Sequence, residues 1–258
     1  MKRFAALCLT LLFLAGLTAC GAKPDTGQEP EEVPGAAETE TAVETDPDAV
    51  TVSTGASDDQ PYFDLVCDYR LMMADPYRFS DADWPGAQGT LKLVDSMIQW
   101  YGDGYLSDGM GYVIQDVSGD GVPELAIGPL PDYDVWLGAL YTLVDGKPQL
   151  VFSYDEYGRY AYTGNGTFFF TGSSGGTAYG QGTYHLTEDG TALICDSFCF
   201  YLDGDRTVYT NTTGSWDVSE SRESGMDIGD FNAWEGFEPE YEIPMTPFSA
   251  SDFVRAEP

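Results

Sequence analysis

Apolar residues recur with helical spacing in the segment between Pro61 and Asp75. Asp58 or Asp59 can cap a helix that takes Pro61 in its first turn, and Asp75-Pro76 should end it, because the residue before a proline avoids helical backbone angles. One face of this helix would carry four apolar residues: Tyr62, Val66, Tyr69 and Met73. The pattern therefore predicts an amphipathic helix that buries this face.

A second apolar stripe begins near Thr90 and predicts another helix. Its apolar positions are Leu91, Val94, Ile98 and Tyr101. Gly102 follows the stripe and is a suitable residue just past the helix end, where a left-handed backbone is common. We expect both helices to pack on one face of a β-sheet.

From Gly111 onward the apolar period changes from helical to two, which is typical of β-strands. Short β-branched and aromatic runs are separated by the turn signals Asp145-Gly146, Asn165-Gly166, Asp189-Gly190 and Asp203-Gly204. Three hairpins follow: Leu140–Val144 with Gln149–Ser153, Tyr160–Thr163 with Thr167–Thr171, and Thr183–Leu186 with Thr191–Cys195. The predicted fold class is α+β, with two N-terminal helices on a mostly antiparallel meander.

The segment from Phe237 to Phe248 is rich in Pro and Glu. We expect it to run irregularly over the surface, with Met245 to Phe248 as the place where it could pair with a strand.

The chain begins with a basic and then apolar leader. Lys2 and Arg3 precede the apolar run Phe4–Leu17, which is shorter than the roughly 20 residues that a transmembrane helix needs. The leader ends in Leu17-Thr18-Ala19-Cys20, which resembles a bacterial lipoprotein signal. The resemblance implies that residues 1–19 are a signal peptide, and that Cys20 is lipidated and anchors the chain on the extracytoplasmic face of the bacterial cell membrane. The alternative is an ordinary secretory signal followed by a chance cysteine.

Composition changes after the leader. Residues 20–60 contain eleven acidic residues, one base and no aromatic residue, which predicts a disordered, extended tether. Residues 61–258 have the length of a single globular α+β domain. The whole chain carries a formal net charge of −32, so nucleic acid is an unsuitable partner, and adhesion to anionic headgroups would need the acyl chains.

One segment, Asp116–Gly128, carries recognisable chemistry. Oxygen donors at loop positions 1, 3, 5, 7 and 9, with Gly at position 6, have the spacing of a Ca²⁺ loop. The candidate ligands are Asp116, Ser118, Asp120, the Val122 carbonyl and Glu124. Position 12 is Ile127 and strands flank the loop, so it resembles the strand-loop-strand calcium motif of FG-GAP-type repeats more closely than an EF-hand.

The calcium loop departs from that pattern in two ways. Ser118 stands where Asp or Asn is usual, and the repeat occurs once. We therefore expect a weak, structural Ca²⁺ site, in the range of about 10⁻⁴ to 10⁻³ M found for extracellular modules. The alternative is a hairpin whose aspartates satisfy the backbone amides of the loop and hold no ion.

Together the leader, the acidic tether, the Asp-Gly-rich loop ending in Pro123-Glu124-Leu125 and the aromatic strands resemble uncharacterised surface lipoproteins of Gram-positive bacteria. This resemblance implies a location and brings no reaction with it.

Candidate catalytic groups have structural explanations. Gly172–Gly176 matches the Gly-x-Ser-x-Gly nucleophile elbow, but a Gly-rich strand follows it where a helix is required, so a hairpin loop is expected. His185 is the single histidine, and we expect it to pair across a strand. Three acidic pairs could serve a glycosidase: Asp155 with Glu156, Asp217 with Glu220, and Glu235 with Glu238.

Removal of the leader takes away Cys8, and if Cys20 is acylated three cysteines remain in the mature chain: Cys67, Cys195 and Cys199. On one uninterrupted strand Cys195 and Cys199 would lie about 13 Å apart, beyond disulfide reach. Either a turn at Asp196-Ser197 brings them together or all three stay reduced.

The sequence thus favours a lipid-anchored extracytoplasmic binding or structural module stabilised by one Ca²⁺ loop, with envelope polysaccharide or another protein as the expected partner. The alternative hypothesis is a carboxylate-based cell-surface hydrolase that acts on glycans.

Overall fold

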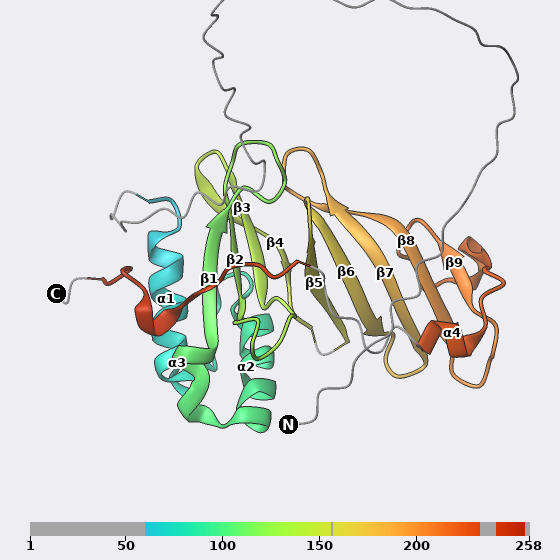
Figure 1. The fold of residues 1–258 in the computed structure, drawn as a ribbon, viewed down its shortest axis with the longest axis horizontal. Helices are drawn as coiled ribbons and strands as arrows, with labels where there is room; N and C mark the ends of the chain where they lie inside the picture. Colours follow the sequence, from blue (N-terminus) through green and yellow to red (C-terminus); the bar gives the residue numbers. More distant parts are fainter. Residues whose placement is uncertain (1–59, 156, 233–240, 256–258) are drawn as a thin grey trace, which may run out of the picture. The chain divides into compact units, whose positions relative to one another are not determined.

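The computed structural model describes residues 60–155, 157–232 and 241–255 (Figure 1). The chain divides after Pro47 into two units, and all described residues belong to the second. The leader, Cys20, nearly all of the acidic segment and the proposed caps Asp58 and Asp59 lie outside the described residues.

Helices come first in the described part of the chain. They are α1 (Phe63–Ala74), η1 (Pro76–Phe79), α2 (Ala87–Tyr101), η2 (Asp103–Tyr105) and α3 (Leu106–Gly109), followed much later by η3 (Val218–Glu220), α4 (Ile228–Asn232) and η5 (Phe248–Ala250). The strands are β1 (Met110–Gln115), β2 (Glu124–Pro129), β3 (Ala139–Val144), β4 (Lys147–Ser153), β5 (Gly158–Gly164), β6 (Thr167–Ser173), β7 (Ala178–Leu186), β8 (Leu193–Leu202), β9 (Tyr209–Asn211), β10 (Arg222–Glu223) and β11 (Thr246–Pro247).

Helix α1 buries the face that the sequence pattern indicates. Val66, Tyr69 and Met73 are buried, and Tyr62 is buried at the N-cap position. Pro61 precedes the helix in a turn. The helix ends at Ala74 because Asp75, which precedes Pro76, takes an extended backbone angle φ of −154°.

Helix α2 begins three residues earlier than the predicted start near Thr90. Gly86 precedes it with a φ of +88°, and Gly89 lies in its first turn against the backbone carbonyl of Tyr154. These two glycines let the helix approach the sheet more closely than any side chain would allow. The buried face therefore runs through Ala87, Gly89, Thr90, Leu93, Val94 and Met97, whereas Leu91 and Ile98 are only partly buried and Tyr101 is exposed.

The strands form two antiparallel sheets, so the fold is α+β and mostly β. Sheet A has the order β11-β1-β2-β3-β4 and sheet B has the order β10-β9-β8-β7-β6-β5. The three predicted hairpins are confirmed as β3 with β4, β5 with β6, and β7 with β8. Asp145-Gly146 and Asn165-Gly166 have positive φ at both turn residues, as a tight two-residue hairpin requires.

The predicted antiparallel meander is divided between two sheets, because strand pairing breaks between β4 and β5. Asp155 and Gly158 close a tight turn through two backbone hydrogen bonds. Strand β5 is then bonded on its outer edge by the segment before β3: the Leu137 amide donates to the Tyr160 carbonyl at 2.9 Å. The edge of β5 is thus covered instead of pairing with β4.

In the described part of the predicted surface segment, 241–248, the surface course is wrong but the expected pairing is confirmed. Thr246 and Pro247 pair with Tyr112 and Gly111 of β1, inside the range where pairing was expected. Ile243, Met245, Phe248 and Phe253 are buried. The tail therefore completes the core of sheet A. The remainder of the predicted surface segment up to residue 240 lies outside the described residues.

Three buried clusters hold these elements together. The first packs α1, α2 and α3 on one face of sheet A and includes Tyr69, Met97, Leu125 and Tyr141. The second joins the other face of sheet A to sheet B through Leu140, Phe152 and Phe168. The third is centred on Phe198 and Phe200 and lies on one face of sheet B, where Trp216 packs against it. Strand β2 is covered on both faces, which explains why all six of its residues are buried.

The described cysteines are all free. A β-bulge leaves Asp196 without a partner in β7, since Ser197 pairs with Thr183 and Cys195 with Tyr184. Cys195 therefore packs with Phe198 and Phe200, whereas Cys199 faces the other side of the sheet, where its Sγ lies 3.5 Å from Thr210 Oγ1. No turn brings the two together, and a disulfide between them would need the strand to be rebuilt.

Candidate functional site

The predicted calcium loop joins β1 to β2 and is folded by its own aspartates. Asp116 accepts hydrogen bonds from the amides of Gly119 (2.7 Å, to Oδ1) and Gly121 (2.8 Å, to Oδ2). Asp120 Oδ1 accepts from the Val122 amide at 2.6 Å. Gly119 and Gly121 both have positive φ, which glycine adopts without strain. The carboxylates thus satisfy loop amides by Asx-type turns.

Glu124 points the other way, into the protein, and its side chain is almost fully buried. Its Oε2 accepts from the amides of Val117 (2.8 Å) and Ser118 (3.2 Å). Its Oε1 accepts from the hydroxyls of Ser118 (3.2 Å) and Thr142 (3.3 Å). Burial raises the pKa of this carboxyl, and the amide donors offset part of the rise.

Two turns of sheet B lie against this loop. A Cβ atom on Gly190, between β7 and β8, would lie 2.7 Å from Glu124 Oε1 and 3.0 Å from Thr142 Oγ1. A Cβ atom on Gly166, between β5 and β6, would lie 2.9 Å from the Val117 carbonyl. The Tyr62 hydroxyl of the α1 N-cap donates to the Pro123 carbonyl at 2.9 Å. The loop is therefore a junction between the helices and both sheets.

The five candidate ligands divide between the two sides of the loop. Asp116 and Asp120 are exposed, Ser118 and Val122 are half-buried, and Glu124 is buried. Within the described ranges, no three acidic, histidine or cysteine side chains form a group that could hold a metal ion. The donor set fits a calcium ion only in part, because Glu124 could bind one only by releasing hydrogen bonds from Val117 and Ser118.

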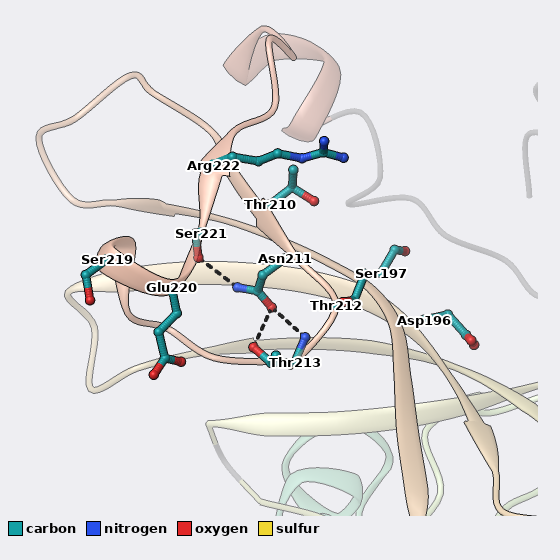
Figure 2. A pocket seen from close by; sticks show the side chains of 10 residues that line it. All are labelled: Asp196, Ser197, Thr210, Asn211, Thr212, Thr213, Ser219, Glu220, Ser221 and Arg222. Carbon is teal, nitrogen blue, oxygen red and sulfur yellow. Dashed lines mark hydrogen bonds between the residues drawn. The ribbon is translucent and has the colours of Figure 1, made fainter.

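Sequence reasoning missed a second candidate site. It is a groove of about 640 Å³ at the end of sheet B formed by β8, β9 and β10. Figure 2 shows its ten polar or charged lining residues, which come from β8, β9, η3, β10 and the segments between them. They are Asp196, Ser197, Thr210, Asn211, Thr212, Thr213, Ser219, Glu220, Ser221 and Arg222. The hydroxyl-rich run Thr210–Thr213 is its main sequence signal, but threonines are equally common on ordinary strand faces.

Asn211 fixes the floor of the groove. Its Nδ2 donates to the Ser215 carbonyl (2.7 Å) and to Ser221 Oγ (2.8 Å), and its Oδ1 accepts from the amides of Thr213 and Gly214. These bonds use the amide group fully, so Asn211 shapes the groove and is not available to a ligand. Asp217 holds the wall by accepting from the Ser219 amide, a bond that lowers the pKa of Asp217.

Other lining groups remain available. In the described part of the chain, the side chains of Glu220 and Arg222 make no hydrogen bond or ion pair, and Figure 2 shows them on different sides of the groove. Asp196 Oδ1 lies 2.7 Å from His185 Nδ1, which confirms that the histidine pairs across strands. The groove thus presents hydroxyls, two carboxylates and one guanidinium to solvent.

The remaining catalytic candidates do not assemble. Gly172–Gly176 spans the end of β6 and the β6–β7 turn, and β7 follows where the nucleophile elbow requires a helix. Glu220 lines the groove but Asp217 is occupied by its turn. Glu156, Glu235 and Glu238, which belong to the other two proposed pairs, lie outside the described residues.

In comparisons with known proteins, no family model, no curated protein and no solved structure matches this chain. Across the described residues, no helix has both the length and the apolar character needed to cross a bilayer.

Proposed function

We propose that this chain is a lipid-anchored extracytoplasmic module that binds a component of the cell envelope without catalysing a reaction, and that the groove between β8, β9 and β10 is its ligand site. The single observation that carries the binding role is this groove, whose floor is held by Asn211 while Glu220 and Arg222 are left unpaired among the described residues. Polar groups that line a concave surface and are not used by the fold can fix the orientation of a ligand there.

Binding can be tested by filling the groove. The full chain, purified in detergent, is incubated with isolated insoluble cell-wall polysaccharide and sedimented. Thr212→Trp places a large side chain in the groove, and we expect it to reduce co-sedimentation at least fivefold. Thr177→Trp, in the exposed β6–β7 turn, is the matched control and should bind normally. Equal binding by both variants contradicts the assignment of the site.

Membrane anchoring through Cys20 rests on the resemblance of the leader to a lipoprotein signal. Two acyl chains hold a protein on a bilayer stably, whereas a chain without them is released. We expect the native chain in the membrane fraction, with the mass of a diacylglyceryl group on the N-terminal cysteine. Cys20→Ala should move the protein to the medium or leave the leader uncleaved. An unmodified cysteine in the mature chain contradicts the proposal.

Calcium is proposed as a structural ligand of the Asp116–Gly128 loop. After chelation, 5 mM Ca²⁺ should raise the midpoint of thermal unfolding, because an ion that binds only the folded state stabilises it. The double variant Asp116→Asn with Asp120→Asn should lose this shift, and Asp103→Asn with Asp108→Asn should keep it. An unchanged midpoint in the native chain shows that the loop works without an ion.

A carboxylate-based hydrolase that acts on glycans is the second candidate function. The observation in its favour is that Asp196 and Glu220 line the same groove. In such enzymes, however, the general acid sits in an apolar environment, whereas the side chain of Asp196 is 43% exposed and bonded to His185. Release of reducing ends from wall polysaccharide by the native chain, lost in Glu220→Gln, would favour the hydrolase over the binding module.

A further inference from the structure

The groove in sheet B has the chemistry of a site for one class of ligand. We propose that it takes a neutral, polyhydroxylated chain, that is, a segment of an uncharged saccharide; this inference rests on the proposed binding function. Its walls present Glu220 and Asp196 as acceptors, Arg222 as a donor, and the hydroxyls of Ser197, Thr210 and Thr212, which both donate and accept.

Sugar hydroxyls can use both kinds of partner at once. A carboxylate accepts a hydroxyl hydrogen more strongly than a neutral oxygen does, and a guanidinium donates to the oxygen of a neighbouring hydroxyl. Glu220 and Arg222 lie two residues apart in the chain and line one groove, yet neither forms an ion pair within the described residues. A ligand with alternating donors and acceptors would satisfy both side chains.

Electrostatics argue against an anionic ligand. The chain has 43 acidic and 11 basic residues, and the groove itself contains two carboxylates against one guanidinium. A phosphate or a uronate would approach a negative surface and meet only Arg222 as a cation. A neutral saccharide has no such cost.

The exposed hydroxyls of Thr183 and Ser197 extend the groove along sheet B, up to Gln181, which is buried and bonded to the Phe231 carbonyl of α4. Ser197 and Cys199 lie two residues apart on β8 and so share one face of the sheet. Thr183 of β7 pairs with Ser197, and Thr210 of β9 pairs with Cys199. The Thr183 and Ser197 hydroxyls are bonded at 2.9 Å. This polar row crosses β7, β8 and β9, so the site suits an extended chain of several sugar units more than a single small molecule.

The inference can be tested by calorimetry on the full chain in detergent. The probes are neutral hexasaccharides of glucose and of N-acetylglucosamine, with poly(glycerol phosphate) and hexagalacturonate as anionic probes. We expect at least one neutral hexasaccharide to bind, and Glu220→Gln and Arg222→Ala each to weaken it about tenfold, the typical effect of losing one charge-assisted hydrogen bond. Glu223→Gln is the matched control, because Glu223 does not line the groove.

The possible outcomes separate the ligand class from the binding function. Failure of every neutral hexasaccharide to bind, or preference for an anionic probe, overturns the neutral-saccharide inference. The proposed function then stands or falls on the sedimentation of wall polysaccharide with Thr212→Trp. If a neutral hexasaccharide binds but Glu220→Gln and Arg222→Ala bind it as the native chain does, the groove is not the site and both proposals fail together.

Discussion

Gly190 shows how one position can couple the two sheets. It has a φ of +66°, and any Cβ atom there would meet the buried Glu124 carboxylate. Gly190→Ala should therefore destabilise the fold in two ways, through the left-handed backbone, at about 1 to 2 kcal/mol, and through the steric overlap, at about 1 to 3 kcal/mol more. Urea unfolding of the purified chain measures the sum.

Gly146→Ala is the matched control for Gly190→Ala. Gly146 has a φ of +73° in the β3–β4 turn, but a Cβ atom there would have open space. Gly146→Ala should therefore lose only the unfolding free energy that comes from the left-handed backbone. Equal losses of unfolding free energy in the two variants would show that the β7–β8 turn does not press on Glu124.

Glu124 should make stability depend on pH with a sign opposite to that of most carboxyls. Burial raises its pKa, so the folded chain keeps this proton at pH values where the unfolded chain has lost it. Its contribution to stability is therefore largest below the ordinary carboxyl pKa and is lost as pH rises through the raised pKa. Each pKa unit corresponds to about 1.4 kcal/mol.

Glu124→Gln removes this titration while keeping the shape. Its amide oxygen can accept from Val117 and Ser118, and its amide nitrogen can donate to the Thr142 hydroxyl. We expect the unfolding free energy of the native chain minus that of the variant to fall as pH rises from 4 to 7. A difference that stays flat or rises with pH refutes the role given to Glu124.

Sequence spacing identified which residues form the loop at Asp116 but not where Glu124 points. The Asp and Gly positions act locally, through amides two to five residues away, so their pattern is visible in the sequence. The direction of Glu124 depends on Thr142 and Gly190, which lie 18 and 66 positions further along the chain. No local pattern reports such neighbours.

At the scale of elements, prediction succeeded where the determining contacts are local. The β3–β4 and β5–β6 hairpins follow from two-residue turns that need positive φ at both positions. The β7–β8 turn is longer, because the Thr187 amide donates a hydrogen bond to the Ala192 carbonyl across it. Strand β8 therefore begins at Leu193, two residues after the predicted Thr191. The groove was not predictable, since the walls around η3 belong to a segment with no periodic pattern.

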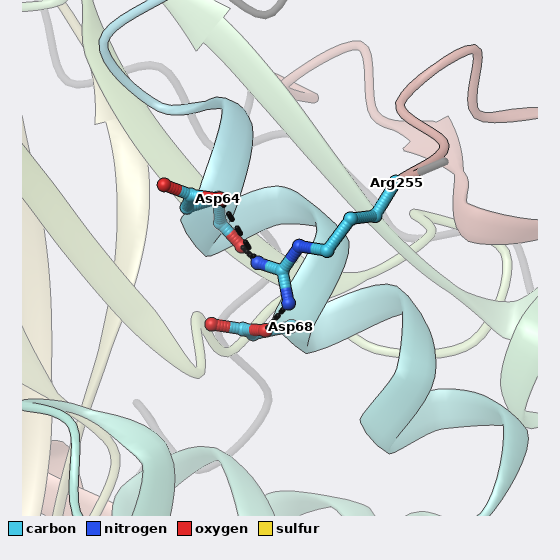
Figure 3. Close-up of polar contacts among 3 residues, drawn as sticks. All are labelled: Asp64, Asp68 and Arg255. Carbon is cyan, nitrogen blue, oxygen red and sulfur yellow. Dashed lines mark hydrogen bonds and ion pairs between the residues drawn. The ribbon is translucent and has the colours of Figure 1, made fainter. Parts of the chain in front are cut away.

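One arginine of the C-terminal segment pairs with α1, beside the contact of Phe253 with Phe63. Figure 3 shows Arg255 between Asp64 and Asp68. Its Nη2 lies 3.0 Å from Asp64 Oδ1 and its Nη1 lies 3.1 Å from Asp68 Oδ1. Arg255 and Asp64 are exposed and Asp68 is half-buried, so solvent screens these pairs and we expect Arg255→Ala to cost less than about 1 kcal/mol of global stability. Hydrogen exchange at the β1–β11 pairing should nevertheless accelerate, because the end of the segment is no longer held.

Salt and a second arginine provide the controls for Arg255. At 1 M NaCl, where charges are screened beyond about 3 Å, the native chain should exchange at β11 almost as fast as Arg255→Ala does at low salt. Arg222→Ala, which removes an arginine without an ion pair among the described residues, should leave β11 unchanged. Identical exchange in the native chain and Arg255→Ala would mean that packing of Phe248 and Phe253 alone holds the segment.

At the scale of the whole molecule, charge repulsion should dominate the response to salt. The formal net charge is −32, while the described residues contain only three ion pairs of Lys or Arg. Raising NaCl from 10 to 150 mM should therefore raise the unfolding midpoint, since screening weakens the repulsion in the compact state. Choline chloride should act equally, and a lower midpoint in salt would show that the ion pairs outweigh the repulsion.

The division into two sheets could not be derived from strand patterns. Consecutive hairpins with regular turns predict one meander, and the break appears only because Leu137, from before β3, takes the edge of β5. Phe152 and Tyr160, with ring centroids 4.7 Å apart, then pack between the two sheets. This contact follows from three-dimensional competition for an edge, which a linear period of two does not encode.

The junction of turns around the Asp116 loop also decides where the chain can be lengthened. Gly166 and Gly190 have backbone or carboxylate atoms beside them, so an inserted peptide would force the two sheets apart at this end. Gly146 and Gly204, at the tips of other turns, have open space around them. A fluorophore peptide or affinity tag should be accepted at Asp145-Gly146 or Asp203-Gly204, which gives two labelling positions that leave the junction of turns undisturbed.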